Sequence, residues 1–271
     1  MKTVRVGDID IAYEQIGPVG RGDPMLLIHG SNLADGLRPL AAALNRQVPS
    51  LPLVRYHRRG VGRSTGGLRP VTTEQQAADA LGVLDALELP AAHILGYSYG
   101  ATIALEVALS APDRIRSLVL LEPIVHEVPS WQGFSRTMEP VMQLYAAGDL
   151  EAAVKATFLG LAGPQWPGLI DSIGPDALSD AIRDTEVYFR VEAPAMRQWT
   201  LDPRRSLAAP VVSVLGDRSG LFFAEGRQLL HQRFPQCVDA DITDATHMLF
   251  LQQPDAIADA VRGFLAPALP G

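Results

Sequence analysis

The chain has 271 residues, of which 47% are hydrophobic and 20% are charged, and its mean hydropathy is +0.10. This composition supports a compact fold with a large buried core and excludes disordered, collagen-like and coiled-coil proteins. Because 23 basic residues stand against 30 acidic ones without a basic run, the formal charge is −7 and a nucleic-acid groove is excluded.

The remaining composition argues against disulfides, metals and membrane spans. The single cysteine, Cys237, has no partner for an internal disulfide and no metal-ligand spacing around it. Charged residues interrupt the apolar residues of segment 1–15, and no window of 18 uncharged apolar residues occurs. We expect a cytoplasmic monomer or homodimer that uses no cofactor and binds neither nucleic acid nor a membrane.

Apart from the segment between Glu122 and Arg205, the predicted elements follow the pattern of an α/β fold. Residues 3–6 and 9–16 have the alternating pattern of an antiparallel hairpin at a sheet edge. Short apolar runs typical of parallel strands covered on both faces then follow at 25–29, 53–56, 93–96, 117–121 and 211–215. Helical patterns lie between them, for example at 73–87 and 101–110. The alternation predicts a doubly wound, mostly parallel α/β sheet of about eight strands.

The alternation stops between Glu122 and Arg205, where no run resembles a strand. Helical patterns occupy 135–147, 150–161 and 178–189. We interpret residues 123–205 as a helical cap inserted into an α/β core formed by 1–122 and 206–271. A second, independent helical domain is the alternative, but the strand pattern that resumes at 211 favours an insertion.

A candidate nucleophile lies in the sequence Gly96-Tyr97-Ser98-Tyr99-Gly100, between an apolar run and a helical run. A sharp strand-to-helix turn of this kind presents a serine in strained backbone geometry, and the flanking glycines prevent clashes. The alternative is that Ser98 is a serine without a catalytic role in a glycine-rich turn. The strand–turn–helix context favours Ser98 as a nucleophile.

A base and an oxyanion site can be placed around that serine. His247 follows the predicted strand 238–242 and precedes the predicted helix 254–265, so it lies at the carboxyl edge of the sheet, where catalytic groups collect. The segment His29-Gly30-Ser31-Asn32 also follows a parallel strand. A backbone N–H of this segment and that of Tyr99 could stabilise a developing oxyanion.

These residues resemble the α/β-hydrolase superfamily over nearly the whole chain. The motifs LLIHG, RRGVGRS, GYSYG, LVLLEP and THMLFLQQPDAI occur in the family's order with similar separations. The resemblance implies Ser98 as nucleophile, His247 as base, the N–H groups of Ser31 and Tyr99 as oxyanion hole, and a cap over the active site. Relatives that open epoxides or displace halide use Asp as nucleophile, so Ser98 argues against both activities.

The third member of the triad departs from the usual pattern. The family commonly carries its acid in a G-x-x-D pattern after the strand matched by 211–215, where this chain has Ser219, with Asp217 earlier in the turn. Some members of the family, including certain haloalkane dehalogenases, instead carry the acid as a Glu directly after the preceding core strand. Glu122 occupies the similar position in this chain, after the strand predicted at 117–121. A carboxylate at either strand end can orient the imidazole. We favour Glu122 over Asp217. His57 replaces a customary Asp, which predicts only a local change in hydrogen bonding.

The cap is rich in aromatic and methionine residues, which suggests an apolar pocket beside Tyr97. We expect Asn32, Tyr97, Trp131 and Phe134 to bind substrate. The resulting hypothesis is a cofactor-free serine hydrolase that cleaves a hydrophobic or aromatic ester, thioester or lactone through an acyl-enzyme. The alternatives are C–C bond hydrolysis, peptide hydrolysis or a biosynthetic lactone or cyclisation step with the same triad, or a receptor-like ligand-binding module.

Overall fold

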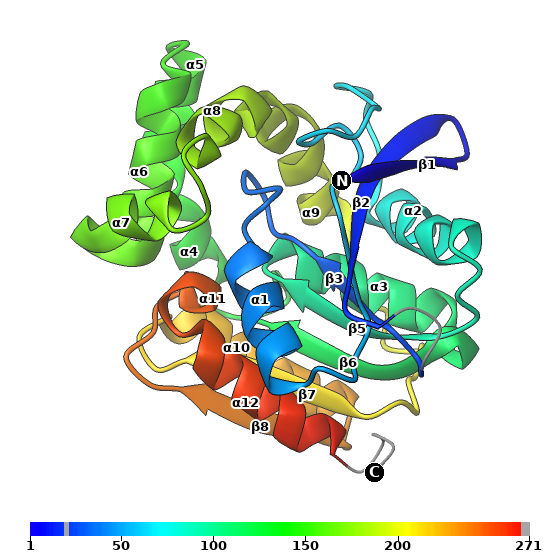
Figure 1. The fold of residues 1–271 in the computed structure, drawn as a ribbon. Helices are drawn as coiled ribbons and strands as arrows, with labels where there is room; N and C mark the ends of the chain where they lie inside the picture. Colours follow the sequence, from blue (N-terminus) through cyan, green and yellow to red (C-terminus); the bar gives the residue numbers. More distant parts are fainter. Residues whose placement is uncertain (19–21, 267–271) are drawn as a thin grey trace.

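The computed structural model describes residues 1–18 and 22–266, which form one eight-stranded sheet flanked by helices (Figure 1). The strand order is β1-β2-β4-β3-β5-β6-β7-β8. The pairs β1–β2 and β2–β4 are antiparallel, and all other neighbours are parallel. The predicted doubly wound, mostly parallel sheet is therefore confirmed. Its strands are β1 (Lys2–Val6), β2 (Ile9–Ile16), β3 (Met25–Ile28), β4 (Leu53–Tyr56), β5 (Ala92–Tyr97), β6 (Ile115–Leu121), β7 (Val211–Gly216) and β8 (Cys237–Ile242).

Helices cover both faces of this sheet because its strands bury side chains on both sides. Along β6, Leu118 and Leu120 belong to one hydrophobic cluster, while Val119 and Leu121 belong to the other, as the two-residue period of a strand requires. The first cluster lies against α2 and α3, and the second against α1 and α12. The helices of the sheet layers are α1 (Arg38–Gln47), α2 (Thr73–Ala86), α3 (Tyr99–Ser110), α10 (Leu221–Arg233), α11 (Leu249–Gln252) and α12 (Pro254–Leu265).

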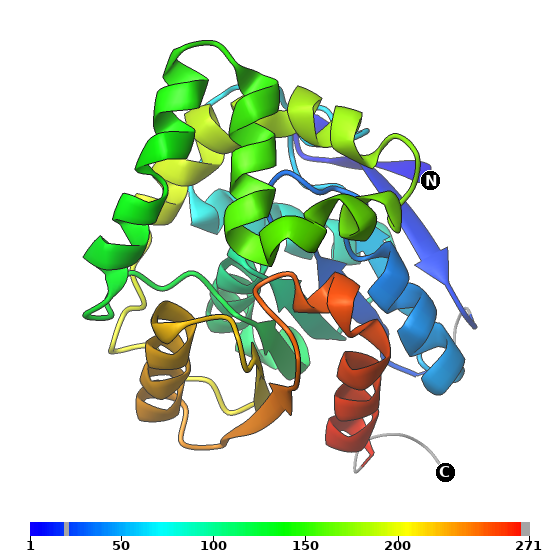
Figure 2. The same ribbon diagram turned by 90° about the vertical axis from the view of Figure 1, so that its left-hand side faces the viewer.

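A second group of helices follows β6 and ends before β7, and it lies together at one end of the sheet (Figures 1 and 2). These helices are α4 (Trp131–Thr137), α5 (Glu139–Ala146), α6 (Leu150–Ala162), α7 (Trp166–Asp171), α8 (Ala177–Val187), the π-helical turn η3 (Tyr188–Glu192) and α9 (Ala193–Gln198). Short 3₁₀ turns occur at Pro112–Arg114 and Gly163–Gln165.

Two of the expected helices of this group differ from a single regular α-helix. The single helix expected over 135–147 is divided at Met138, because Pro140 has no N–H to continue the ladder and fits only the first turn of α5. The helix expected over 178–189 passes into the π-helical turn η3, and Pro194 stands at the start of α9.

His57 lies in the loop after β4, and both of its ring nitrogens form hydrogen bonds. His57 Nδ1 accepts from the Arg63 N–H (3.0 Å), so Nε2 carries the proton and donates to Asp35 Oδ1 (3.2 Å). Arg59 binds Asp79 with two hydrogen bonds of 2.7 Å, and the Ser64 hydroxyl donates to the His57 carbonyl (2.7 Å). These bonds join the loop to Asp35 and to α2, and they also connect residues within the loop.

Over the described ranges 1–18 and 22–266, none of the helices has both the length and the apolar character that crossing a bilayer demands.

Candidate active site

Ser98 occupies the sharp turn between β5 and α3 with φ +54° and ψ −124°, a conformation that L residues rarely adopt. The turn requires glycine on both sides. A Cβ on Gly96 would lie 2.6 Å from Cα of Ala101, and a Cβ on Gly100 would lie 2.2 Å from the carbonyl oxygen of Ile28. The bare backbone at Gly96 lets α3 lie close to β5, and the bare backbone at Gly100 lets it lie close to the end of β3.

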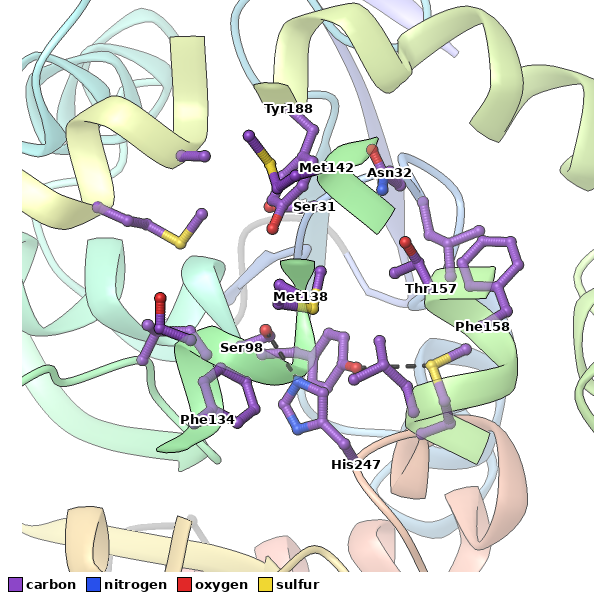
Figure 3. A pocket seen from close by; sticks show the side chains of 18 of the residues that line it. Ser31, Asn32, Ser98, Phe134, Met138, Met142, Thr157, Phe158, Tyr188 and His247 are labelled. Carbon is purple, nitrogen blue, oxygen red and sulfur yellow. Dashed lines mark hydrogen bonds between the residues drawn. The ribbon is translucent and has the colours of Figure 1, made fainter. Parts of the chain in front are cut away.

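His247 connects this serine to a carboxylate from a third part of the chain. Its Nε2 lies 3.0 Å from Ser98 Oγ, and its Nδ1 lies 2.5 Å from Glu122 Oε2 (the serine contact is dashed in Figure 3). Since an ionised carboxylate can only accept, Nδ1 donates to Glu122 and Nε2 is free to accept the serine proton. Ser98, His247 and Glu122 therefore form a continuous hydrogen-bonded chain.

Glu122 stands directly after β6 with φ +50° and only 2% of its surface exposed. Its Oε1 accepts from the Gly216 N–H at 2.8 Å, and its Oε2 faces His247. A buried carboxylate is costly unless each oxygen has a donor. Both oxygens are satisfied here, one by the neighbouring strand β7 and one by the imidazole.

Asp217, the alternative acid, is held elsewhere. It is exposed, and its Oδ1 accepts from the Ala245 N–H at 3.1 Å. This bond and a second backbone bond from Asp244 lower the pKa of Asp217. The side chain thus fastens the loop that carries His247, while both ring nitrogens of His247 are engaged by other residues.

Two aromatic rings pack against the imidazole of His247. The ring of Phe223 stacks on that of His247 with centroids 4.2 Å apart and planes 12° apart, and Tyr97 lies 5.0 Å away. His247 is 4% exposed. This packing restricts the rotation of the ring, so its two nitrogens stay aligned with Ser98 and Glu122.

Two backbone N–H groups near Ser98, those of Ser31 and Tyr99, have no acceptor among the described residues. Within the part of the chain that the structure describes, neither Ser31 nor Tyr99 donates its N–H to another group. Gly30, which precedes Ser31, lies close to Ser98, since a Cβ on Gly30 would lie 3.2 Å from Ser98 Cβ. Tyr99 N–H belongs to the first turn of α3, where helical donors have no intrahelical partner. Both groups are therefore available to an oxyanion.

A pocket opens above Ser98 and encloses about 970 Å³ of empty space, including its open mouth. Asn32, Tyr97, Trp131 and Phe134, the side chains expected to bind substrate, all line it. The side chain of Tyr99 does not, because it turns into the core and is completely buried. Figure 3 shows the labelled residues around Ser98 and His247.

The pocket is also lined by Met142 of α5 and by Thr157, Phe158 and Leu161 of α6, which no sequence pattern had indicated. Met138, between α4 and α5, and Tyr188 of η3 line it too, and both belong to the aromatic and methionine residues in which segment 123–205 is rich. The spacing of Met138 and Met142 is that of one helix face, a signal that identifies neighbours but not the direction of the face. Among the described residues, no three His, Cys, Asp or Glu side chains gather as a metal ion would require.

Comparison with known proteins agrees with this architecture. The alpha/beta hydrolase fold family matches residues 23–163, more than half of the chain. The chain belongs to the alpha/beta hydrolase family. The crystal structure of the enol-lactonase from Burkholderia xenovorans superposes with a TM-score of 0.81 over 98% of this chain and 100% of that one, and at 20% identity this likeness shows the fold alone.

Curated relatives match shorter stretches. A protein of Azorhizobium caulinodans, provisionally named the carbamate hydrolase RutD, is 35% identical over 162 residues, which cover 59% of this chain and 57% of that protein. The rhodomycin D methylesterase DnrP of Streptomyces peucetius is 38% identical over 109 residues, covering 38% and 37%. The chain therefore spans about half the length of the curated relatives it matches, or less.

Proposed function

We propose that the protein is a serine hydrolase that cleaves a carboxylic ester, thioester or lactone with a hydrophobic acyl or aromatic part, through an acyl-enzyme and without a cofactor. The observation that carries the proposal is the chain of hydrogen bonds Ser98–His247–Glu122, with distances of 3.0 and 2.5 Å. Relatives named carbamate hydrolase, methylesterase and enol-lactonase support the same class of reaction.

The proposed reaction begins when Ser98 Oγ attacks the carbonyl carbon while His247 Nε2 takes the hydroxyl proton. Glu122 stabilises the imidazolium that forms. The carbonyl oxygen becomes an oxyanion and accepts hydrogen bonds from the Ser31 and Tyr99 N–H groups, each worth about 3–4 kcal/mol in comparable sites. When the C–O or C–S bond breaks, the leaving group receives the proton from Nε2. Water then repeats the sequence and releases the acid and free Ser98.

The side chains over the site support the apolar half of the substrate class. Trp131, Phe134 and Met138 lie at the pocket wall together with Phe158, and we propose that residues 123–205 act as the cap that supplies most of this surface. An apolar wall with a few convergent polar groups is typical of small-molecule sites. A cytoplasmic location is part of the same proposal.

The test uses Ser98→Ala, which removes the nucleophile and leaves the shape of the turn. Hydrolysis of p-nitrophenyl butyrate should fall to background, and a fluorophosphonate probe should label the wild type at Ser98 but not the variant. An unlabelled, folded wild type would overturn the serine mechanism. If the probe reacts but esters, thioesters and lactones are not hydrolysed, a panel of C–C and peptide substrates tests whether the same triad serves another bond.

A further inference from the structure

We propose that Arg58 and Glu192 form a buried positioning pair that fixes the oxyanion loop, residues 29–31, from the side of the cap. This inference rests on the proposed function, because it assigns a role to residues that would not touch the substrate. Arg58 follows β4 and Glu192 ends the π-helical turn η3, so the pair joins the sheet to the cap helices.

Arg58 acts on the peptide that carries one of the proposed oxyanion donors. Its Nη2 donates to the Gly30 carbonyl at 3.0 Å, and its Nε donates to the His29 carbonyl at 3.0 Å. The Gly30 carbonyl and the Ser31 N–H belong to one planar peptide unit and point in opposite directions. By holding that carbonyl, Arg58 determines where the Ser31 N–H points.

His29 adds a second constraint on the same peptide. Its Nε2 accepts from the Arg58 N–H at 3.0 Å, so Nδ1 carries the proton and donates to the Gly30 carbonyl at 2.7 Å. Burial lowers the pKa of His29 well below its ordinary value, and the positive charge of Arg58 adds to this effect, so the ring stays neutral in this arrangement. The Gly30 carbonyl therefore accepts two hydrogen bonds, one from the Arg58 guanidinium and one from the His29 ring, which the backbone N–H of Arg58 orients.

Arg58 also contacts the residue that carries the other proposed donor. Its guanidinium lies 5.2 Å from the centre of the Tyr99 ring. The Tyr99 hydroxyl accepts from Gln76 Nε2 at 3.2 Å, and Gln76 Oε1 accepts from Arg58 Nη1 at 2.7 Å. One guanidinium therefore supports both sides of the oxyanion site.

Glu192 supplies the charge that keeps this guanidinium in place. Its Oε1 lies 2.7 Å from Arg58 Nη1, and the two residues are each only 1% exposed. Within the described ranges, neither carboxylate oxygen has an aligned hydrogen bond, so Arg58 is its compensating group. Because a buried ion pair adds little net stability over a well-packed apolar pair, we assign its effect to orientation.

The cap end of the pair also reaches the pocket. Tyr188 begins the same π-helical turn and lines the pocket, as does Ala193, which directly follows Glu192. The ion pair thus ties the seating of this cap segment to the orientation of the Gly30–Ser31 peptide. The orientation of the oxyanion donors therefore depends on the position of this cap segment.

The experiment compares Glu192→Gln and Arg58→Lys with Glu106→Gln. For p-nitrophenyl butyrate, kcat should fall at least about tenfold in the first two variants while KM changes less than about threefold, because a misplaced donor is missed mainly in the transition state. The affinity of a trifluoromethyl ketone, which forms an oxyanion on Ser98, should fall by the same factor as kcat/KM. A Lys cannot reach two carbonyls as the guanidinium fork does.

Glu106 provides the matched control. It is 2% exposed and also links the cap segment to the sheet layers, through Trp199 Nε1 at 2.9 Å and Arg205, but it makes no contact with residues 29–31. Glu106→Gln should lower the Tm and leave kcat within about threefold of wild type. If Glu192→Gln behaves in the same way, the pair is only structural and the proposal is wrong.

A double variant guards against loss of folding. Arg58→Met with Glu192→Met removes both charges together and should retain the fold, since no buried charge is left alone. Its kcat should still be reduced at least about tenfold, and wild-type kcat in this variant would overturn the proposal. Failure of the serine mechanism would look different, because the fluorophosphonate would then leave the wild-type Ser98 unlabelled.

Discussion

At the scale of single residues, two strained conformations aim the reactive side chains. Ser98 and Glu122 follow the neighbouring strands β5 and β6, and both have φ near +50°. Such a conformation costs on the order of 1–3 kcal/mol and persists only where the surroundings impose it. Here the hydrogen bonds between neighbouring strands continue past the strand ends and hold both residues in this conformation. The Ser98 N–H donates to the Leu121 carbonyl, and the Glu122 N–H donates to the Val214 carbonyl. Both side chains are thereby turned toward His247.

The acid can be identified by replacing each candidate carboxylate with its amide. In Glu122→Gln the side chain can still accept from Gly216, but it no longer stabilises the imidazolium, so kcat should fall by about 10²–10⁴. Asp217→Asn should keep kcat within about threefold, because Asp217 contacts only the backbone of the His247 loop. Steady-state kinetics with p-nitrophenyl butyrate measures both. An inactive Asp217→Asn beside an active Glu122→Gln would reverse the assignment.

At the scale of elements, the active-site turn depends on how closely α3 approaches β3. Every residue of α3 from Tyr99 to Leu109 is buried, so the helix cannot move away from the sheet to accommodate an added atom. Gly100 is the point of closest approach, where the carbonyls of Ile28 and His29 would lie 2.2 and 2.4 Å from a Cβ. Gly100 therefore allows α3 to pack against the chain at Ile28 and His29, where the oxyanion loop begins.

Gly100→Ala should lower the free energy of unfolding by about 1–3 kcal/mol or more through overpacking. It should also lower kcat, because the shift falls on the loop that precedes Ser31. Gly160→Ala is the control: Gly160 lies exposed on α6, and an added Cβ would have nothing within 4 Å, so alanine there should raise stability by about 0.5–1 kcal/mol. Urea unfolding measures both changes. Equal stability of Gly100→Ala and wild type would contradict the close approach.

At the scale of the whole molecule, the helices between β6 and β7 are anchored where the chain enters and leaves them. The Leu201 N–H donates to Glu127 Oε1 at 2.6 Å, which joins the outgoing and returning segments. The Ser130 N–H donates to Glu225 on α10 at 2.8 Å, and Arg205 binds Glu106 on α3. These contacts hold the two ends of the segment 123–205 to each other and to the helices of the sheet layers, and side chains of this segment line the pocket at Ser98.

The size of the pocket can be changed from α5. Met142 lines the pocket, and Met142→Trp should lower kcat/KM for p-nitrophenyl dodecanoate at least about tenfold more than for the acetate, because added bulk excludes the longer acyl chain. Leu159→Trp is the matched control, since Leu159 on α6 is 51% exposed and is not among the lining residues. An unchanged ratio of the two esters in Met142→Trp would show that the acyl chain lies elsewhere.

The sequence by itself determined the sheet, the sharp turn at Ser98 and the position of the candidate base, because each depends on a local pattern. A buried parallel strand requires a short apolar run, the turn at Ser98 requires the neighbouring glycines, and His247 follows a strand end. The break at Pro140 was also encoded locally, although the apolar periodicity concealed it.

Only the tertiary structure decided which carboxylate meets His247, which cap side chains face the pocket, and that Arg58 meets Glu192. The partners in these contacts lie far apart along the chain, as do His247 and Glu122, which are separated by 125 residues. Their meeting depends on the register of neighbouring strands and on the rotation of packed helices. Neither quantity is fixed by residues close in sequence, because both result from the packing of all elements together.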